Sequence, residues 1–209
     1  MGLWAEQVVP RFTDLTLGVT EVRRHREPVL AGATGDLVEI GFGSGLNVPL
    51  YPPSVRRVHA VEPSSVGRRL AAKRVARSPV PVEFVGLDGQ DLPLGDESVD
   101  AALSTFTLCT IPDAGRALRE VYRVLRPGGR FLFLEHGVSP EPDVARWQHR
   151  MNGFQQRIAA GCNMDRPIDR MVRDAGFDVE QLGNDYLKGP RIAKPWGYLY
   201  HGVAVKLSG

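Results

Sequence analysis

The chain has few cysteines and no long apolar run. Its 209 residues include two cysteines, Cys109 and Cys162, which do not form a CxxC motif. This spacing predicts neither a disulfide framework nor a zinc site, so no metal is expected. A reduced, cytoplasmic protein is the simplest interpretation. No apolar run approaches the roughly 20 residues that a transmembrane helix needs, and the N-terminus lacks the apolar segment of a signal peptide.

An excess of charge of one sign is also lacking. The chain has 26 Lys and Arg against 24 Asp and Glu, for a formal net charge of +2. This balance indicates neither a nucleic-acid partner nor a strongly anionic surface as ligand. The basic clusters at 23–26 and 68–77 are interpreted as solvated helix faces. Length and a hydrophobic content of 43% suit one globular domain spanning 1–209.

Short apolar runs alternate with helical patterns over the first two thirds of the chain. The runs are almost continuously apolar, which is typical of strands buried on both faces. They predict strands at 37–40, 58–62, 82–87, 99–104 and 130–136. Helices are predicted between them at about 64–77 and 113–125, and the second ends at an RPGG stop. Repeated strand–helix–strand units predict a parallel sheet with helices on both faces.

The pattern changes after residue 136. A predicted helix at about 143–160 carries one apolar stripe, which either joins the core or forms the wall of a lid over a bound molecule. The stripe consists of Trp147, Met151, Phe154 and Ile158. A further helix is predicted from about 165 to Gly176. The last two strands, at 177–182 and 198–207, are joined by a short loop and should pair antiparallel. The fold class is therefore α/β, with one open sheet of about seven strands, mostly parallel with an antiparallel edge strand.

Three glycines follow the first predicted strand directly. In DLVEIGFGSGLN, residues 36–47, Gly41, Gly43 and Gly45 stand at alternate positions. A simple turn needs one glycine, so three indicate that a ligand approaches the backbone, and the third lets the following helix pack closely. The dinucleotide motif G-x-G-x-x-G would need a glycine where the chain has Leu46. The motif is therefore not the one that binds a pyrophosphate.

Acidic residues follow the next two strands as well. Glu62, in VEPS, stands where a carboxylate can accept hydrogen bonds from both hydroxyls of a ribose. The third strand runs into LDGQDLPLGDESVD, the fourth into STFTLCT, and the fifth ends in EH after ALREVYRVLRPGGRFLFL.

These motifs, in this order between residues 36 and 136, resemble those of class I S-adenosylmethionine (SAM)-dependent methyltransferases. The resemblance implies a Rossmann-like fold, SAM as cofactor, S-adenosylhomocysteine (SAH) as product, and no metal. It also implies that Asp88 accepts from the adenine amino group. Glu39 either lies near the SAM ammonium or only orders the loop. The implied cofactor-binding residues are Glu39, Gly41, Gly43, Gly45, Asn47, Glu62, Pro63, Asp88, Gly89, Gln90, Thr105 and Cys109.

Further segments, most of them in the second half of the chain, resemble those of one smaller family of methyltransferases. YPPSVRRVHAVEPS, TFTLCTI, RWQHRMNGFQQRIAAGCNMDR and YLYHGVAVK are similar to segments of the methyltransferase-like family that includes the alkyl thiol S-methyltransferases. Those relatives begin with an apolar anchor helix, whereas residues 1–30 here are polar and broken by Pro10 and Pro28. The resemblance implies an N-terminal helical cover (1–30), a SAM-binding core (36–136) and an acceptor side (137–209), with at most peripheral membrane contact.

The resemblance implies a small, apolar methyl acceptor, with a thiol as first choice. A thiol is a poor nucleophile until it ionises, so His136 is a candidate catalytic base, although such a histidine can also serve only in packing. The alternatives are methylation of a lipid amine or of a quinone, or a SAM-binding protein without catalysis. Since the fourth strand is not followed by an Asn/Asp-Pro-Pro-aromatic box, methylation of nucleic-acid bases is disfavoured. The oligomeric state stays open.

Overall fold

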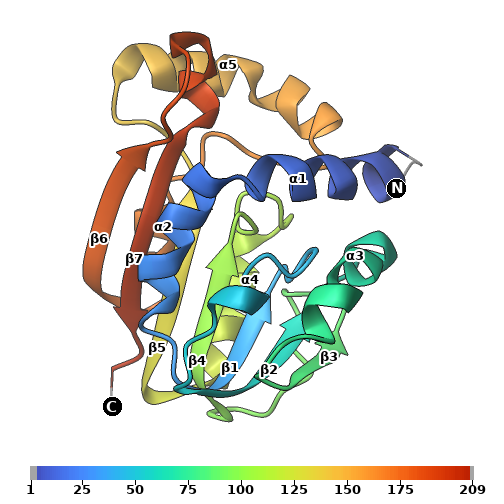
Figure 1. Ribbon diagram of the computed structural model, residues 1–209. Helices are drawn as coiled ribbons and strands as arrows, with labels where there is room; N and C mark the ends of the chain where they lie inside the picture. Colours follow the sequence, from blue (N-terminus) through green and yellow to red (C-terminus); the bar gives the residue numbers. More distant parts are fainter. Residues whose placement is uncertain (1–3, 208–209) are drawn as a thin grey trace.

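A computed structural model describes residues 4–207 of the chain, and in it seven strands form one sheet (Figure 1). The strand order is β3-β2-β1-β4-β5-β7-β6. The strands are β1 (Gly35–Ile40), β2 (Val55–Val61), β3 (Val82–Gly86), β4 (Val99–Thr105), β5 (Leu125–His136), β6 (Asp178–Tyr186) and β7 (Tyr198–Val205). The predicted fold class is confirmed.

The first five strands pair parallel, and β7 runs antiparallel to both of its neighbours, β5 and β6. The antiparallel strand β7 therefore lies between β5 and β6, and β6 forms the edge of the sheet. The chain leaves β1 for β2 on one side and returns to β4 on the other, so the strand order reverses between β1 and β4. In open α/β sheets, ligands bind in the crevice at the carboxyl ends of the strands at this point.

Helices cover both faces of the sheet. Residues of α4 and α6 belong to the core on one face, and residues of α2 and α3 to the core on the other. Figure 1 shows α1 and α5 above the carboxyl ends of the parallel strands. The helices are η1 (Trp4–Val8), α1 (Val9–Leu17), α2 (Thr20–Leu30), η2 (Val48–Leu50), α3 (Ser65–Val75), α4 (Ala114–Val124), α5 (Pro142–Ile158), α6 (Ile168–Asp174) and η3 (Arg191–Trp196). No helix within residues 4–207 is long and apolar enough to cross a membrane.

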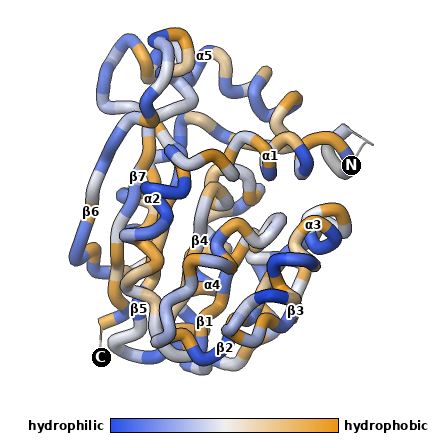
Figure 2. Tube along the Cα trace, viewed as in Figure 1, coloured by the Kyte–Doolittle hydropathy of each residue, from blue (hydrophilic) through white to orange (hydrophobic). Residues whose placement is uncertain are grey.

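Strand β5 shows how one apolar run serves two cores. Phe131 and Phe133 pack into the cluster under α4, whereas Leu132 and Leu134 pack into the cluster under α2. This division follows from the alternation of side chains along a strand. The central strands are accordingly hydrophobic in Figure 2, and hydrophilic residues recur along α2 and α3.

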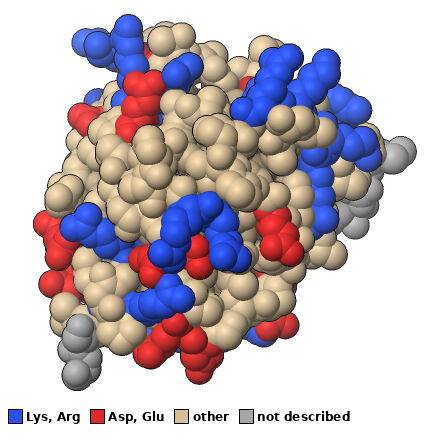
Figure 3. Space-filling view, turned by 60° about the horizontal axis from the view of Figure 1, so that its bottom comes forward, with Lys and Arg blue, Asp and Glu red and all other residues tan. Residues whose placement is uncertain are grey.

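Charged pairs tie the amino ends of the strands together. Figure 3, which brings the lower end of the molecule forward, shows acidic and basic side chains interspersed. Asp36 at the start of β1 pairs with Arg56 and Arg57 of β2, and Asp100 of β4 also pairs with Arg56. Because the side chains of Arg56 and Arg57 are 65% and 59% exposed, each pair contributes little to stability.

One local prediction was wrong, and one of two alternatives is excluded for part of α5. A helix was predicted to follow Gly45, but the chain forms only the 3-10 turn η2 there. The Tyr51-Pro52-Pro53 segment explains this, because a residue before proline avoids the α-helical region. The stripe of α5 also does not join the core as a whole, since Phe154 and Ile158 are 57% and 44% exposed.

Gln148 ties α5 to the end of the sheet. Its side chain is fully buried, and its amide nitrogen donates to the carbonyl oxygens of Gly137 (3.1 Å) and Pro195 (2.8 Å). Its amide oxygen accepts from the backbone N–H of Ser139 at 2.9 Å. One side chain therefore joins α5 to the segment after β5 and to η3.

We expect Gln148→Leu to lower the free energy of unfolding by about 1–3 kcal/mol, because the substitution removes three hydrogen bonds and leaves the buried backbone groups of Gly137 and Ser139 without this partner. The control is Arg146→Leu on the same helix, where the side chain is exposed and the change should stay within about 0.5 kcal/mol. Urea unfolding measures both values. Equal stability of the two variants would show that Gln148 does not anchor α5.

Candidate active site

The three glycines after β1 adopt a backbone conformation that other residues avoid. Gly41, Gly43 and Gly45 have φ angles of 69°, 57° and 76°. A Cβ atom on Gly41 would lie 2.0 Å from Oγ1 of Thr107, so that position is also closed sterically. A Cβ atom on Gly43 would meet nothing nearer than 3.8 Å. There is therefore room for a ligand beside Gly43, in the middle of the loop.

Glu62 joins this glycine loop to the start of α3. Its carboxylate accepts from the N–H of Gly43 at 2.6 Å and from the N–H of Ser64 at 2.7 Å. The side chain is only 6% exposed, and this burial raises its pKa, while the two backbone donors oppose the rise. A carboxylate has about four acceptor positions. Glu62 can therefore hold the loop and still accept from two hydroxyls of a ligand.

A buried polar cluster lies at the carboxyl ends of β1 and β4. Glu39, which is 1% exposed, accepts from Nδ2 of Asn47 at 3.0 Å and from the hydroxyl of Tyr51. Nη1 of Arg26 donates to Oδ1 of Asn47 and to Oγ1 of Thr105, each at 2.8 Å. We call these five residues the Arg26–Glu39 cluster. It brings together three of the predicted site residues and adds Arg26 and Tyr51.

Burial shifts both charged groups of this cluster. It raises the pKa of Glu39 from 4.5 to about 7, although Tyr51, Asn47 and Arg26 oppose the shift. Burial also lowers the pKa of Arg26 to about 10, and Glu39 opposes this shift. Nε of Arg26 has no hydrogen-bond partner within the described part of the chain. A buried donor of this kind favours an anionic ligand group.

Arg26 corrects the interpretation of residues 23–26 as a solvated face. The side chain is only 4% exposed, whereas Arg23 and Arg24 are exposed as predicted. Val22, Arg26 and Val29 are all buried on α2. Their i, i+4, i+7 spacing marks one face of a helix, so this spacing is the signal that could have placed Arg26 inside.

Helix α1 is tied to the glycine loop from above. Asp14 accepts from the hydroxyl of Ser44 at 2.6 Å and from Nη1 of Arg74 at 2.9 Å. Arg74 also donates to the carbonyl oxygen of Ser44 at 2.8 Å. Phe12 and Leu15 on the same helix stay 65% and 73% exposed. Helix α1 therefore covers the loop and leaves apolar side chains at the surface nearby.

The segment after β3 forms its own turn. Asp88 accepts from the backbone N–H and from Nε2 of Gln90, and these two bonds hold the pKa of Asp88 below its ordinary value. Gln90 in turn accepts from the N–H of Asp113 at 2.9 Å. Gly89 is buried, whereas Pro63, after β2, is exposed. The described hydrogen bonds do not join Asp88 to the Arg26–Glu39 cluster or to Glu62.

A second group of side chains lies at the ends of β4 and β5. Cys109, in the loop after β4, and His136, at the end of β5, are 3% and 6% exposed. Nδ1 of His136 lies 3.7 Å from Sγ of Cys162, and its Nε2 lies 3.5 Å from the carbonyl oxygen of Pro195. The fold makes the two cysteines neighbours, so the lack of a CxxC motif does not exclude a shared site.

The two thiols are not equivalent. A hydrogen bond between them raises the pKa of Cys109 well above its ordinary value, and burial adds to this rise. The same bond lowers the pKa of Cys162. Cys162 is therefore the thiol of the pair that ionises first.

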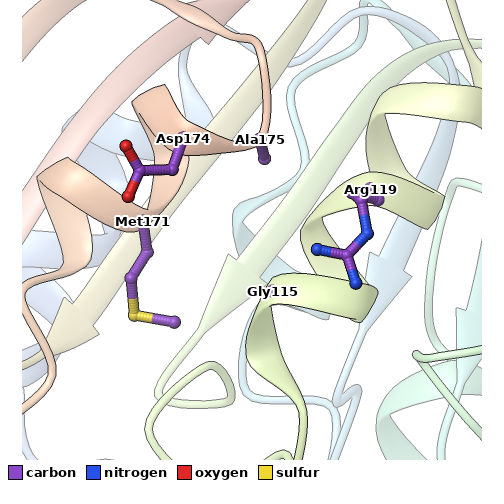
Figure 4. A pocket seen from close by; sticks show the side chains of 5 residues that line it. All are labelled: Gly115, Arg119, Met171, Asp174 and Ala175. Atoms are coloured by element: carbon purple, nitrogen blue, oxygen red, sulfur yellow. The ribbon is translucent and has the colours of Figure 1, made fainter.

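A hollow in the surface lies apart from these groups. It opens between α4 and α6 and is lined by Gly115, Arg119, Met171, Asp174 and Ala175 (Figure 4). None of these residues belongs to the glycine loop, to the Arg26–Glu39 cluster or to the cysteine pair. The hollow therefore has no part in the candidate site.

Comparisons with known proteins show the family of the chain. Residues 38–133 match the family model of a methyltransferase domain. The chain is 33% identical to human thiol S-methyltransferase TMT1A over 186 residues, which are 84% of this chain and 73% of that protein. It is 27% identical to phosphatidylethanolamine N-methyltransferase of Cereibacter sphaeroides over 177 residues, 79% of this chain and 82% of that protein.

A solved structure shares the fold. It is the methyltransferase in complex with the Trm112 methyltransferase activator of Haloferax volcanii, with a TM-score of 0.72, 18% identity, and coverage of 98% of this chain and 96% of that one. The identity to TMT1A extends over most of both proteins, and the expected fold is present. The chain therefore belongs to the SAM-dependent methyltransferases, in the same family as human thiol S-methyltransferase TMT1A.

Proposed function

We propose that this enzyme transfers the methyl group of SAM to the sulfur of a small, apolar thiol. The observation that carries the proposal is the presence of two different groups at one edge of the sheet. Charged and backbone groups suited to SAM surround the ends of β1 and β2. A sulfur- and imidazole-containing group, Cys109 with His136 and Cys162, lies at the ends of β4 and β5.

In the proposed complex, the ribose, the adenine, the ammonium group and the carboxylate group of SAM each have a partner. The adenosyl ribose lies beside Gly43 and donates its hydroxyls to Glu62. The ammonium group lies at Glu39, and the carboxylate accepts from Nε of Arg26. Asp88 and the backbone of Gly89 and Gln90 contact the adenine. These assignments match opposite charges in buried surroundings, where ion pairs and hydrogen bonds are strong.

The acceptor side supports an apolar substrate. Trp147 and Trp196 meet edge to face, with ring centroids 4.8 Å apart, where α5 contacts η3. Methyl transfer from SAM mainly requires that the acceptor be oriented, and orientation alone can lower a barrier by about 7–11 kcal/mol. The name of the relative TMT1A favours a thiol, and that of the second relative keeps a lipid amine as the alternative. The role of His136 as a general base stays a prediction.

A panel assay tests the acceptor. The enzyme is incubated with methyl-labelled SAM and with apolar thiols, amines, phenols, phosphatidylethanolamine and a demethylated quinone. We expect transfer to thiols to be at least tenfold faster than to any other class. Faster transfer to the lipid amine or to the quinone would contradict the thiol proposal. SAM binding without transfer to any class would contradict catalysis on these acceptors.

Glu62→Ala should weaken the binding of SAH by about 2–4 kcal/mol, because two charge-assisted hydrogen bonds of about 1.5–3 kcal/mol each are lost and are not fully additive. Isothermal titration calorimetry measures the change. The control is Glu83→Ala on the neighbouring strand β3, where the side chain is exposed and SAH binding should not change. Equal affinity of both variants would remove Glu62 from the site.

The affinity for SAH should fall as the pH falls through about 7. Burial raises the pKa of Glu39 to about 7, so the free enzyme holds this carboxyl mostly protonated at pH 6. A bound ammonium group stabilises the ionised form and lowers that pKa, so binding releases a proton. Affinity should then drop by up to about tenfold for each pH unit below 7.

Glu39→Gln should remove this dependence, and calorimetry between pH 6 and pH 8 measures it. Repeating the titration in two buffers of different ionisation enthalpy counts the proton released. An unchanged pH profile in the variant would show that Glu39 does not face the ammonium group.

A further inference from the structure

Cys109, His136 and Cys162 bring three metal-binding atoms together. The two sulfur atoms and one ring nitrogen all lie within 4.8 Å of one another. In tetrahedral zinc sites, bonds of about 2.3 Å to sulfur and 2.0–2.1 Å to nitrogen separate the ligand atoms by about 3.6–3.8 Å. The distance of 3.7 Å between Sγ of Cys162 and Nδ1 of His136 agrees with this separation.

The backbone holds Cys109 and Cys162 against each other. Asn163, next to Cys162, donates from its N–H and from Nδ2 to the carbonyl oxygen of Cys109, at 2.7 and 3.0 Å. Cys162 follows a turn in which Ala160 and Gly161 have φ angles of 49° and 94°. A residue other than glycine with positive φ is uncommon and costs energy, so the surrounding structure must favour this turn.

The carboxylate of Glu135 orders the loop that carries Cys109. It is fully buried, accepts from the hydroxyl of Ser104 at 2.6 Å, and accepts from the N–H of Thr107 with both oxygens at 2.9–3.0 Å. The sulfur of Cys109 is therefore presented from a fixed loop rather than from a mobile one.

His136 has the orientation of a metal ligand. Its Nε2 faces the carbonyl oxygen of Pro195 at 3.5 Å, and Gln148 fixes that same oxygen. A histidine that donates from one ring nitrogen to a carbonyl keeps the other nitrogen unprotonated, and metal-binding histidines are usually held in this way. The unprotonated nitrogen is then Nδ1, which faces Cys162.

We propose that Cys109, His136 and Cys162 bind a thiophilic divalent metal ion, with zinc as first choice, and leave a fourth position open. Two thiolates and one imidazole select zinc over magnesium or calcium. Three protein ligands with an open position are typical of catalytic rather than structural zinc sites. The open position lies on the acceptor side of the proposed active site, beside the loop that connects β4 to α4.

The role of the metal, unlike its binding, rests on the proposed thiol methylation. An acceptor thiol bound at the open position would lose its proton to solvent and become a thiolate, so in this proposal His136 holds the metal and is not the general base. Its sulfur then attacks the methyl carbon of SAM. The new sulfur–methyl bond forms as the bond between that carbon and the sulfonium breaks, and the electron pair stays on the sulfur of SAH. The methylated product is a neutral thioether, which is a weaker ligand than a thiolate and is released.

Titration of the reduced, metal-free protein with Co²⁺ tests the site. We expect one equivalent to bind per chain, with thiolate-to-cobalt charge-transfer absorption that Zn²⁺ abolishes. The Cys109→Ser/Cys162→Ser double variant should lose this absorption, and His136→Ala should bind Co²⁺ at least tenfold more weakly. The matched control is His149→Ala, an exposed histidine of α5 that faces Asp165, which should bind Co²⁺ like the unmodified protein.

A second measurement on each variant shows whether a loss of Co²⁺ binding comes from misfolding. For His136→Ala, an SAH affinity within twofold of the unmodified protein shows that the variant is folded, and for the double variant, which removes the expected cofactor contact Cys109, an unchanged far-UV circular dichroism spectrum and thermal midpoint show this. Absence of Co²⁺ binding to the reduced protein, or absorption that persists in the double variant, would overturn the proposal. Recovery of the freshly purified protein as a metal-free Cys109–Cys162 disulfide, detected by intact mass, would also overturn it.

The activity assay separates the metal from the acceptor. Removal of the metal should lower thiol methylation at least tenfold, and stoichiometric Zn²⁺ should restore it. Suppose that the protein binds the metal at these residues but methylates no thiol. The proposed metal site would then stand, and the proposed thiol acceptor would be refuted. Thiol methylation at the full rate without metal would refute the role of the metal and keep the acceptor.

Discussion

The carboxylate of Glu62 is the constraint on which the site depends. It holds the N–H groups of Gly43 and Ser64, and thereby fixes the glycine loop of β1 against the start of α3. The loop has positive φ angles at all three glycines, a conformation that costs energy in other residues and that its hydrogen bonds hold in place. A buried carboxylate with two backbone donors supplies that order. The same oxygens remain able to accept from a ligand, so order and binding come from one group.

Two groups of side chains with different chemistry lie at this edge of the sheet. The Arg26–Glu39 cluster at β1 and β4 is charged and buried, and its pKa shifts reflect burial opposed by partners. The cysteine and histidine group at β4 and β5 contains soft ligand atoms and no carboxylate ligand. This separation suits a reaction in which a charged cofactor must meet an apolar sulfur nucleophile. Helices α1 and α5 lie above this edge in Figure 1.

Sequence reasoning could predict features that are local along the chain. The apolar runs and the RPGG stop predicted the strands and α4, and the motifs placed Glu39 and Glu62 at the carboxyl ends of the first two strands. It failed where contacts are distant in sequence. Arg26 was interpreted as part of a solvated basic cluster; its spacing with Val22 and Val29 could have indicated burial, but not its contacts with Asn47 and Thr105. The proximity of Cys109 and Cys162 depends on the turn after α5, which no motif predicts.

The most direct test of the central claim is a crystal structure of the enzyme with SAH. The account predicts that the ribose hydroxyls lie within hydrogen-bond distance of the Glu62 carboxylate, with the adenosyl group beside Gly43. It also predicts that the sulfur of SAH faces the loop that carries Cys109. SAH bound elsewhere, or bound in the crevice with no contact to Glu62, would contradict the account.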